Sequence, residues 1–164
     1  MGKIVLGIVI VLFGGLCGYV CTKRFRKRAL FFRQFYDFNE RFINEISYYK
    51  RSLDVFLSGY NYRGEFNELL EAYKEDLAMP EKFLKALRDN ELFFFLKNEE
   101  KKFIFDYFSM LGKGDSFSQK SCFIAQKEGI VALRNAAEAT AKKYGDLYLK
   151  IGILCGLLFL ILIL

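Results

Sequence analysis

The stretch IVLGIVIVLFGGLCGYVCTKRFRKR, residues 4–28, decides the fold of this chain. Residues 4–22 carry no charge, and as an α-helix they are roughly 28 Å long at about 1.5 Å per residue. That length matches the hydrocarbon core of a bilayer, so we predict a membrane-spanning helix. The cations that follow at once are Lys23, Arg24, Arg26, Lys27 and Arg28. By the positive-inside rule they place the next segment in the cytoplasm, against anionic lipid headgroups.

A second uncharged apolar segment lies at residues 151–164, and with residues 147–150 it reaches roughly 27 Å as a helix. Lys142, Lys143 and Lys150 precede it, and they give the same cytoplasmic side. We therefore predict a cell-membrane protein that crosses twice, with both termini outside. The predicted domains are a transmembrane helix at 1–22, a cytoplasmic bundle at 23–150 and a transmembrane helix at 151–164 that can begin near 147.

A cleaved signal peptide is the competing interpretation of the first segment. Leu16 and Val20 stand before Cys17 and Cys21, where a signal peptidase prefers a small residue. The dense basic cluster after the segment also resists translocation. We therefore expect the first segment to be retained.

The amino-acid composition argues against several classes of function. The formal net charge is +6, and Lys3 together with the five cations at 23–28 accounts for it. Because the rest of the chain is balanced, we predict no nucleic-acid binding. Histidine, the commonest general base and metal ligand, is absent, and no Gly-rich phosphate loop occurs. We therefore predict a protein that is not an enzyme, with no catalytic residue, no metal and no cofactor.

Between the spans, apolar residues recur every three or four positions, which predicts an all-α, antiparallel bundle of about six helices. The longest stripe predicts one helix from about Arg24 to Ser58, with Gly59 as a left-handed cap. Further expected features are a helix over 66–77 that Pro80 ends or resets, a short helix near 83–87, N-caps at Asn90 and Asn98, a stop at Gly112, and a last helix capped by Asp115 or Ser116. This last helix can continue unbroken into the membrane.

Two local patterns suggest contacts. Phe93, Phe94 and Phe95 are consecutive, so at least one ring is predicted to be exposed, or buried against another subunit or lipid headgroups. Each span also carries two glycines four residues apart, which form a groove for close helix packing: Gly14 and Gly18, and Gly152 and Gly156. Pairing within the chain, pairing between copies in a homo-oligomer, and no pairing all stay open.

The first and last cytoplasmic helices both attach to the membrane, so their far ends are expected to meet away from the bilayer. This places the turns at 59–64 and 112–115 together at a tip that faces the cytosol. The residues predicted to bind a partner there are Tyr60, Tyr62, Arg63, Lys113 and Asp115. The alternative is that both turns are only solvated connections.

Several stretches recur in the order of a known family. They are the first span with its basic border, Asn44–Tyr48 followed by Leu53, Leu111–Gly112 with Asp115 and Gln119, and Lys143–Gly145 with Leu147 and Tyr148 before Gly152 and Gly156. Together they resemble the stage III sporulation protein AB family of endospore-forming bacteria. Ser52, where the family often has proline, and the absence of tryptophan are departures from the pattern.

The resemblance implies a membrane component of the channel complex that joins mother cell and forespore, on the mother-cell side of the forespore membrane. The family's cytoplasmic domain is similar to the helical domains of platform proteins in type II secretion and type IV pilus machines, which sit beside a hexameric ATPase. By analogy, the chain would anchor or couple a separate secretion-type ATPase, similar to stage III sporulation protein AA, among other channel membrane proteins.

Two other classes of function stay open. One is a membrane-bound enzyme or lipid-modifying factor, with carboxylates such as Glu40 and Glu45 acting at the bilayer surface. The other is a small membrane adaptor or lipid-surface factor outside any secretion assembly.

Overall fold

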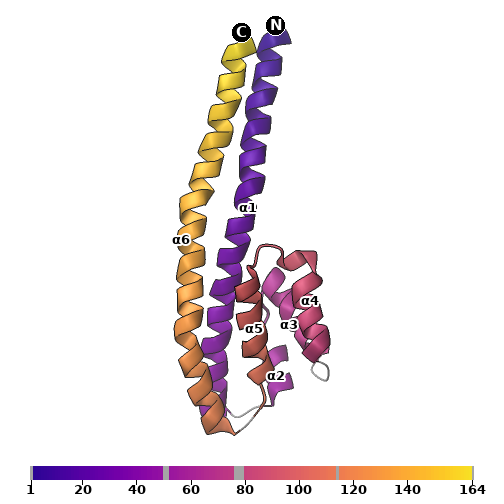
Figure 1. Ribbon diagram of the computed structural model, residues 1–164, viewed down its shortest axis with the longest axis vertical. Helices are drawn as coiled ribbons and strands as arrows, with labels where there is room; N and C mark the ends of the chain where they lie inside the picture. The colour runs from indigo at the N-terminus through magenta and orange to yellow at the C-terminus, as the bar shows by residue number, and fades with distance from the viewer. Residues whose placement is uncertain (1, 50–51, 76–79, 114, 164) are drawn as a thin grey trace. The chain divides into compact units, whose positions relative to one another are not determined.

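The computed structural model describes residues 2–49, 52–75, 80–113 and 115–163 (Figure 1). The elements are α1 (Gly2–Asn44), the π-helix η1 (Glu45–Tyr49), α2 (Leu53–Ser58), α3 (Glu65–Glu75), α4 (Pro80–Asp89), the 3₁₀ turn η2 (Glu91–Phe93), α5 (Asn98–Met110) and α6 (Ser116–Ile163). No strand occurs in these ranges, so the predicted all-α fold is confirmed for them. α6 is a single helix, as the sequence allowed.

The chain divides into two compact units. The pair unit consists of residues 1–29 and 136–164, and the bundle unit consists of residues 30–135. These bounds follow contacts within the fold and do not locate a membrane. The predicted domain bounds therefore stay a prediction.

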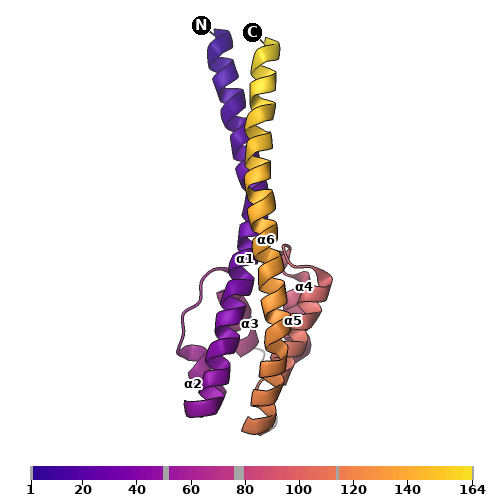
Figure 2. The same ribbon diagram turned by 90° about the vertical axis from the view of Figure 1, so that its left-hand side faces the viewer.

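In the pair unit, α1 and α6 run side by side in opposite directions (Figures 1 and 2). Both helices expose large apolar side chains: Val9, Leu12, Phe13, Leu16, Tyr19 and Val20 on α1, and Leu147, Tyr148, Ile151, Ile153, Leu154, Leu157, Leu158, Phe159 and Ile161 on α6. Within the described residues, one helix, over Phe117–Ile161, is long and apolar enough to cross a membrane. The two-span hairpin therefore stays a prediction.

The core of the bundle unit is aromatic. The predicted stripe on α1 is buried at all four of its phenylalanines in this unit, Phe31, Phe35, Phe38 and Phe42. The Phe35 ring packs edge-on against Tyr107 of α5 with ring centroids 4.8 Å apart. Phe42 packs in the same manner against a residue of α6, Phe123, at 4.9 Å. Aromatic rings bury much apolar area each, so this stripe organises the unit.

Contacts along α1 give the directions of its neighbours. Phe31, Phe35 and Phe38 meet Phe95, Phe103 and Phe108 in that order, so α5 runs parallel to α1. Phe42, Glu40 and Tyr36 meet Phe123, Lys127 and Arg134 in that order, so α6 runs antiparallel to α1. The predicted antiparallel packing of the first and last helices is confirmed for these two. The bundle as a whole is not strictly antiparallel, because α2, α3 and α4 return the chain to the Phe31 end before α5 begins (Figure 1).

The predicted continuous helix to about Ser58 is wrong at its C-terminal end. α1 passes into η1 at Glu45, and α2 begins at Leu53 after an extended Ser52 (φ −63°, ψ 150°). Gly59 adopts a right-handed conformation (φ −78°), so the predicted left-handed cap is also wrong. The break escaped the periodicity because α2 returns Phe56 to the same core.

Most of the other predicted ends are confirmed. Gly112 has φ 73° and follows the end of α5. The Asn90 side chain accepts a hydrogen bond from the Leu92 backbone N–H at 2.9 Å. The predicted cap at Asn98 is displaced by one residue, because Lys97 is the N-cap and its backbone N–H donates to the Glu100 carboxylate at 2.9 Å.

Candidate functional site

The four glycines of the predicted packing grooves lie on the facing sides of α1 and α6. A methyl group on Gly14 would lie 2.5 Å from the backbone oxygen of Gly152 and 3.5 Å from the backbone nitrogen of Gly156. A methyl group on Gly152 would collide with the Gly14 oxygen and lie 3.4 Å from the Gly18 Cα. The two backbones are therefore as close as a pair of helices allows, and only glycine fits at the crossing. This geometry pairs the grooves within one chain.

Thr22 extends the contact between the two helices by a hydrogen bond. Its buried hydroxyl lies 2.8 Å from the Gly18 oxygen, one turn back on α1, and 3.2 Å from the Gly145 oxygen on α6. A hydroxyl has one hydrogen, so the two oxygens share it. Thr22 was not predicted to be part of this contact, although its four-residue spacing from Gly18 places it on the same face of α1.

An aromatic stack follows beyond Thr22. The Phe25 ring lies nearly parallel to Tyr144 and to Tyr148, with centroid distances of 5.5 Å and 5.8 Å. Gly14, Gly18, Thr22 and Phe25 are spaced by four, four and three residues, so they form one face of α1. We call this face, with Tyr144, Gly145, Tyr148, Gly152 and Gly156 of α6, the packing seam.

The basic cluster beside the packing seam is partly exposed. Lys23, Arg24 and Arg26 are exposed, Lys27 is half-buried and Arg28 is buried. Arg24, Lys27 and Arg28 also make contacts within the chain. The exposed members have the arrangement that contact with anionic headgroups needs, and this role stays a prediction.

The predicted partner-binding turn at 59–64 lies against α1. The Arg41 guanidinium stands over the rings of Tyr60 and Tyr62, at 4.5 Å and 5.4 Å from their centroids. The side chain of Gln34 holds the next residue twice: the Arg63 N–H donates to its Oε1 at 2.6 Å, and its Nε2 donates to the Arg63 oxygen at 2.8 Å. Burial raises the pKa of Tyr62 to about 12.

The other predicted turn begins α6. Asp115 Oδ2 accepts hydrogen bonds from the backbone N–H groups of Phe117 at 3.2 Å and Ser118 at 3.4 Å. Asp115 therefore caps α6, as predicted, and the hydrogen bonds from Ser118 lower the pKa of its carboxyl. A methyl group on Gly112 would meet the Leu53 side chain at 3.3 Å, so this turn packs at the start of α2.

The contacts of the turn at 59–64 extend along α1 from Arg41, three residues before the end of the helix, to Gln34. Gln34, which holds Arg63, is ten residues before the end of α1, or about 15 Å along the helix. The contacts of the other turn are with the start of α2. The role of the five predicted residues in binding a partner stays a prediction.

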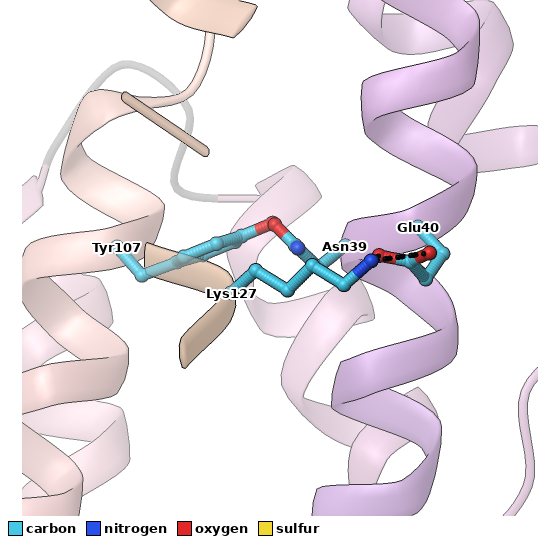
Figure 3. Close-up of polar contacts among 4 residues, drawn as sticks. All are labelled: Asn39, Glu40, Tyr107 and Lys127. Carbon is cyan, nitrogen blue, oxygen red and sulfur yellow. Dashed lines mark hydrogen bonds and ion pairs between the residues drawn. The ribbon is translucent and has the colours of Figure 1, made fainter. Parts of the chain in front are cut away.

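Two polar pairs join α1 to its neighbours (Figure 3). The Tyr107 hydroxyl donates to Asn39 Oδ1 at 2.9 Å, and burial raises the pKa of Tyr107 well above its ordinary value. Lys127 Nζ lies 2.9 Å and 3.0 Å from the two carboxylate oxygens of Glu40, and this hydrogen bond raises the pKa of Lys127.

The carboxylates considered for surface catalysis do not form a pair in the structure. Glu40 is paired with Lys127, and Glu45 is buried within η1. Among the described residues, no three or more His, Cys, Asp or Glu side chains are grouped so that they could hold a metal ion.

The chain was compared with protein families, curated proteins and solved structures. The model of the family described as stage III sporulation protein AB matches residues 3–164. The chain belongs to this family. The resemblance found in the sequence is therefore confirmed, and the family links the chain to sporulation. No curated protein and no solved structure matched.

Proposed function

We propose that this chain is a non-catalytic, two-pass membrane platform of the channel complex that joins mother cell and forespore. In this role it anchors or couples a separate secretion-type ATPase. One observation carries the proposal: both helices of the pair unit expose large apolar side chains, and glycines line their closest approach. Helix pairs of this construction suit lipid, where small residues allow close packing and apolar side chains face the acyl chains.

Both helices contribute to this pattern. On α1 the outward residues include Leu12, Phe13 and Leu16, and on α6 they include Leu154 and Phe159. The packing seam, by contrast, consists of glycines, a threonine and a stacked aromatic cluster. We therefore propose that α1 spans the membrane as well as α6, with the exposed cations after Thr22 on the cytoplasmic side.

The topology is tested by reporter fusions to the full-length chain. We expect alkaline phosphatase to be active at either terminus and inactive when inserted beside Lys113, since the enzyme matures only outside the cytoplasm. Activity at one terminus alone would mean that the chain crosses once. Alkaline phosphatase activity beside Lys113 would show the opposite topology, with the bundle unit outside the cytoplasm.

The bundle unit would present the partner surface. Tyr60, Arg63, Lys113 and Asp115 are exposed and Tyr62 is half-buried. Their backbones are fixed, because Gln34 holds Arg63 and Asp115 caps α6. A partner that contacts both turns would therefore meet backbone segments that are held in place within the bundle unit.

Copurification tests the proposal. The tagged full-length chain is isolated in mild detergent from sporulating cells during engulfment, and its companions are identified by mass spectrometry. We expect a secretion-type ATPase and other channel membrane proteins. A variant with Tyr60, Arg63 and Lys113 changed to alanine should lose the ATPase, whereas a control with the exposed Glu68 and Lys85 changed to alanine should retain it.

The outcomes separate the alternatives. Equal recovery of the ATPase with all variants would reject these turn residues and leave the platform role. A chain that is expressed but recovered alone would favour a small membrane adaptor or lipid-surface factor outside any secretion assembly.

A further inference from the structure

The bundle unit exposes apolar side chains at the end where both of its chain connections leave for the pair unit. Leu30 is the first residue of its part of α1, and Leu92 and Phe94 belong to the connection between α4 and α5. Their exposed fractions are 43%, 42% and 55%. Phe93 and Phe95 are buried. The prediction that at least one ring of this run is exposed is therefore confirmed.

Ring contacts fix the level of this connection along α1. The Phe93 and Phe95 rings lie 6.5 Å and 5.7 Å from the ring of Phe31, measured between centroids. Phe31 directly follows Leu30, so Leu92 and Phe94 stand at the first turn of the bundle unit's part of α1. Figure 1 shows the connection between α4 and α5 at the end of the bundle unit opposite α2.

This level is close to the predicted membrane border. α1 is one helix from Gly2 to Asn44, and Leu30 follows Lys23 by seven residues, or about 10 Å. The headgroup layer extends roughly 5–8 Å beyond the hydrocarbon core on each side. The exposed cations Lys23, Arg24 and Arg26 are predicted to contact anionic lipid headgroups at this part of α1. Leu92 and Phe94 thus stand a few ångströms beyond this layer, a gap that their side chains bridge when they point toward the membrane.

We propose that Leu92 and Phe94 insert into the interfacial layer of the membrane that the spans cross, so that the bundle unit docks on the lipid surface. The inference rests on the proposed two-span topology. Next to the loop, the exposed Glu91 and Lys97 carry opposite charges, so apolar insertion supplies the local attraction.

The chain has no tryptophan, so a single Phe→Trp change introduces the only indole. The full-length Phe94→Trp variant is reconstituted in vesicles of phosphatidylethanolamine and phosphatidylglycerol, with and without brominated acyl chains. We expect blue-shifted emission, loss of intensity with brominated lipid, and weak quenching by aqueous acrylamide. Leu92→Trp gives a second, independent reading, and far-UV circular dichroism confirms the helix content of each variant.

Two matched variants make the result decisive. Phe117→Trp probes the start of α6, where the native ring is 78% exposed, and it should respond to acrylamide and not to brominated lipid. Phe13→Trp probes the first proposed span and should be quenched by brominated lipid. If Phe13→Trp is quenched by lipid while Phe94→Trp and Leu92→Trp behave like Phe117→Trp, the docking inference fails and the topology stands.

The remaining outcomes are also distinct. If Phe13→Trp does not respond to brominated lipid, the topology itself fails. If Phe94→Trp is shielded from both quenchers, a second copy or another protein covers the loop, and the membrane contact is rejected.

Discussion

Changing Tyr107 to Phe removes one hydrogen bond from the interior of the bundle unit. Tyr107 and Asn39 are both 0% exposed, and the Tyr107 hydroxyl donates to Asn39 Oδ1 at 2.9 Å (Figure 3). Within the described part of the chain, Asn39 Nδ2 has no hydrogen-bond partner. The native amide thus already carries one unpaired group, and Tyr107→Phe leaves its oxygen unpaired as well.

The cost follows from desolvation. Tyr107→Phe should lower the free energy of unfolding by about 1–3 kcal/mol, the penalty for a buried polar atom that loses its partner. Asn39→Leu leaves the Tyr107 hydroxyl unpaired but also removes the unpaired Nδ2, so its cost should lie in the lower part of that range. The double variant replaces both partners by apolar groups of similar volume, and its stability should lie within about 1 kcal/mol of the parent.

The assay is urea unfolding of the full-length chain in mild detergent, followed by near-UV circular dichroism of the aromatic core. Tyr48→Phe is the matched control, because Tyr48 is 79% exposed, and it should change stability by no more than about 0.5 kcal/mol. The double-mutant cycle should give a coupling energy of about 1–3 kcal/mol. Additive losses without coupling would show that these residues do not act as one buried polar pair.

Three further predictions follow from the seam, the tyrosines and the cap of α6. Gly152→Ala should push α1 and α6 apart and remove the hydrogen bond from Thr22 to Gly145, which is worth about 0.6 kcal/mol in a membrane helix pair. Thermal unfolding of this variant in vesicles should therefore occur at a lower temperature. Gly15→Ala is the control and should have no effect, because its new methyl group would lie 4.0 Å from Ile153. Burial raises the pKa of Tyr62 and of Tyr73 from 10.0 to about 12, so their phenolate absorbance should appear near pH 12 in the folded chain and near pH 10 in urea. This contribution to stability is complete below pH 10 and is lost as the pH rises through 12, and an unchanged titration in urea would contradict it. Asp115→Ala should speed amide hydrogen exchange at Phe117 and Ser118 more than Asp115→Asn does, because asparagine keeps an acceptor oxygen, and equal exchange in both variants would exclude the cap.

Hydrophobic periodicity predicted the core of the bundle unit well and its helix ends less well. The spacing of Phe31, Phe35, Phe38 and Phe42 is dictated by one buried face, and all four rings are buried. The break before α2 was missed because periodicity reports which face is buried and not whether the backbone continues. Ser52 is extended in the structure, but a serine is equally compatible with an exposed position inside a helix, so its residue type did not predict the break.

The contacts that place the turns could not be predicted from the sequence. Gln34 holds Arg63 across 29 residues by hydrogen bonds to the Arg63 backbone N–H and backbone oxygen. Because every residue has these backbone groups, the residue type at position 63 does not reveal the contact. The close approach of the two helices, by contrast, requires small side chains, and these can be recognised in the sequence as glycines four residues apart. For that reason the close approach at Gly14 and Gly152 was expected as one of three outcomes, whereas the contact between Gln34 and Arg63 was not.

The exposure of phenylalanine side chains differs between the two units. Phe35 is buried in the bundle unit, whereas Phe13 in the pair unit is 67% exposed. More than a dozen large apolar side chains of the pair unit are exposed in this way, six of them on α1 between Val9 and Val20. Full burial of one such side chain contributes roughly 1.5–3 kcal/mol, and these side chains are about half exposed. If they faced water, the pair unit would lose on the order of 10–20 kcal/mol of hydrophobic free energy in total. That amount equals or exceeds the net stability of a typical domain, about 5–15 kcal/mol, so this surface favours a lipid environment. Because α1 supplies six of these residues, the same reasoning applies to both helices, and a single span through α6 would leave the α1 surface in water.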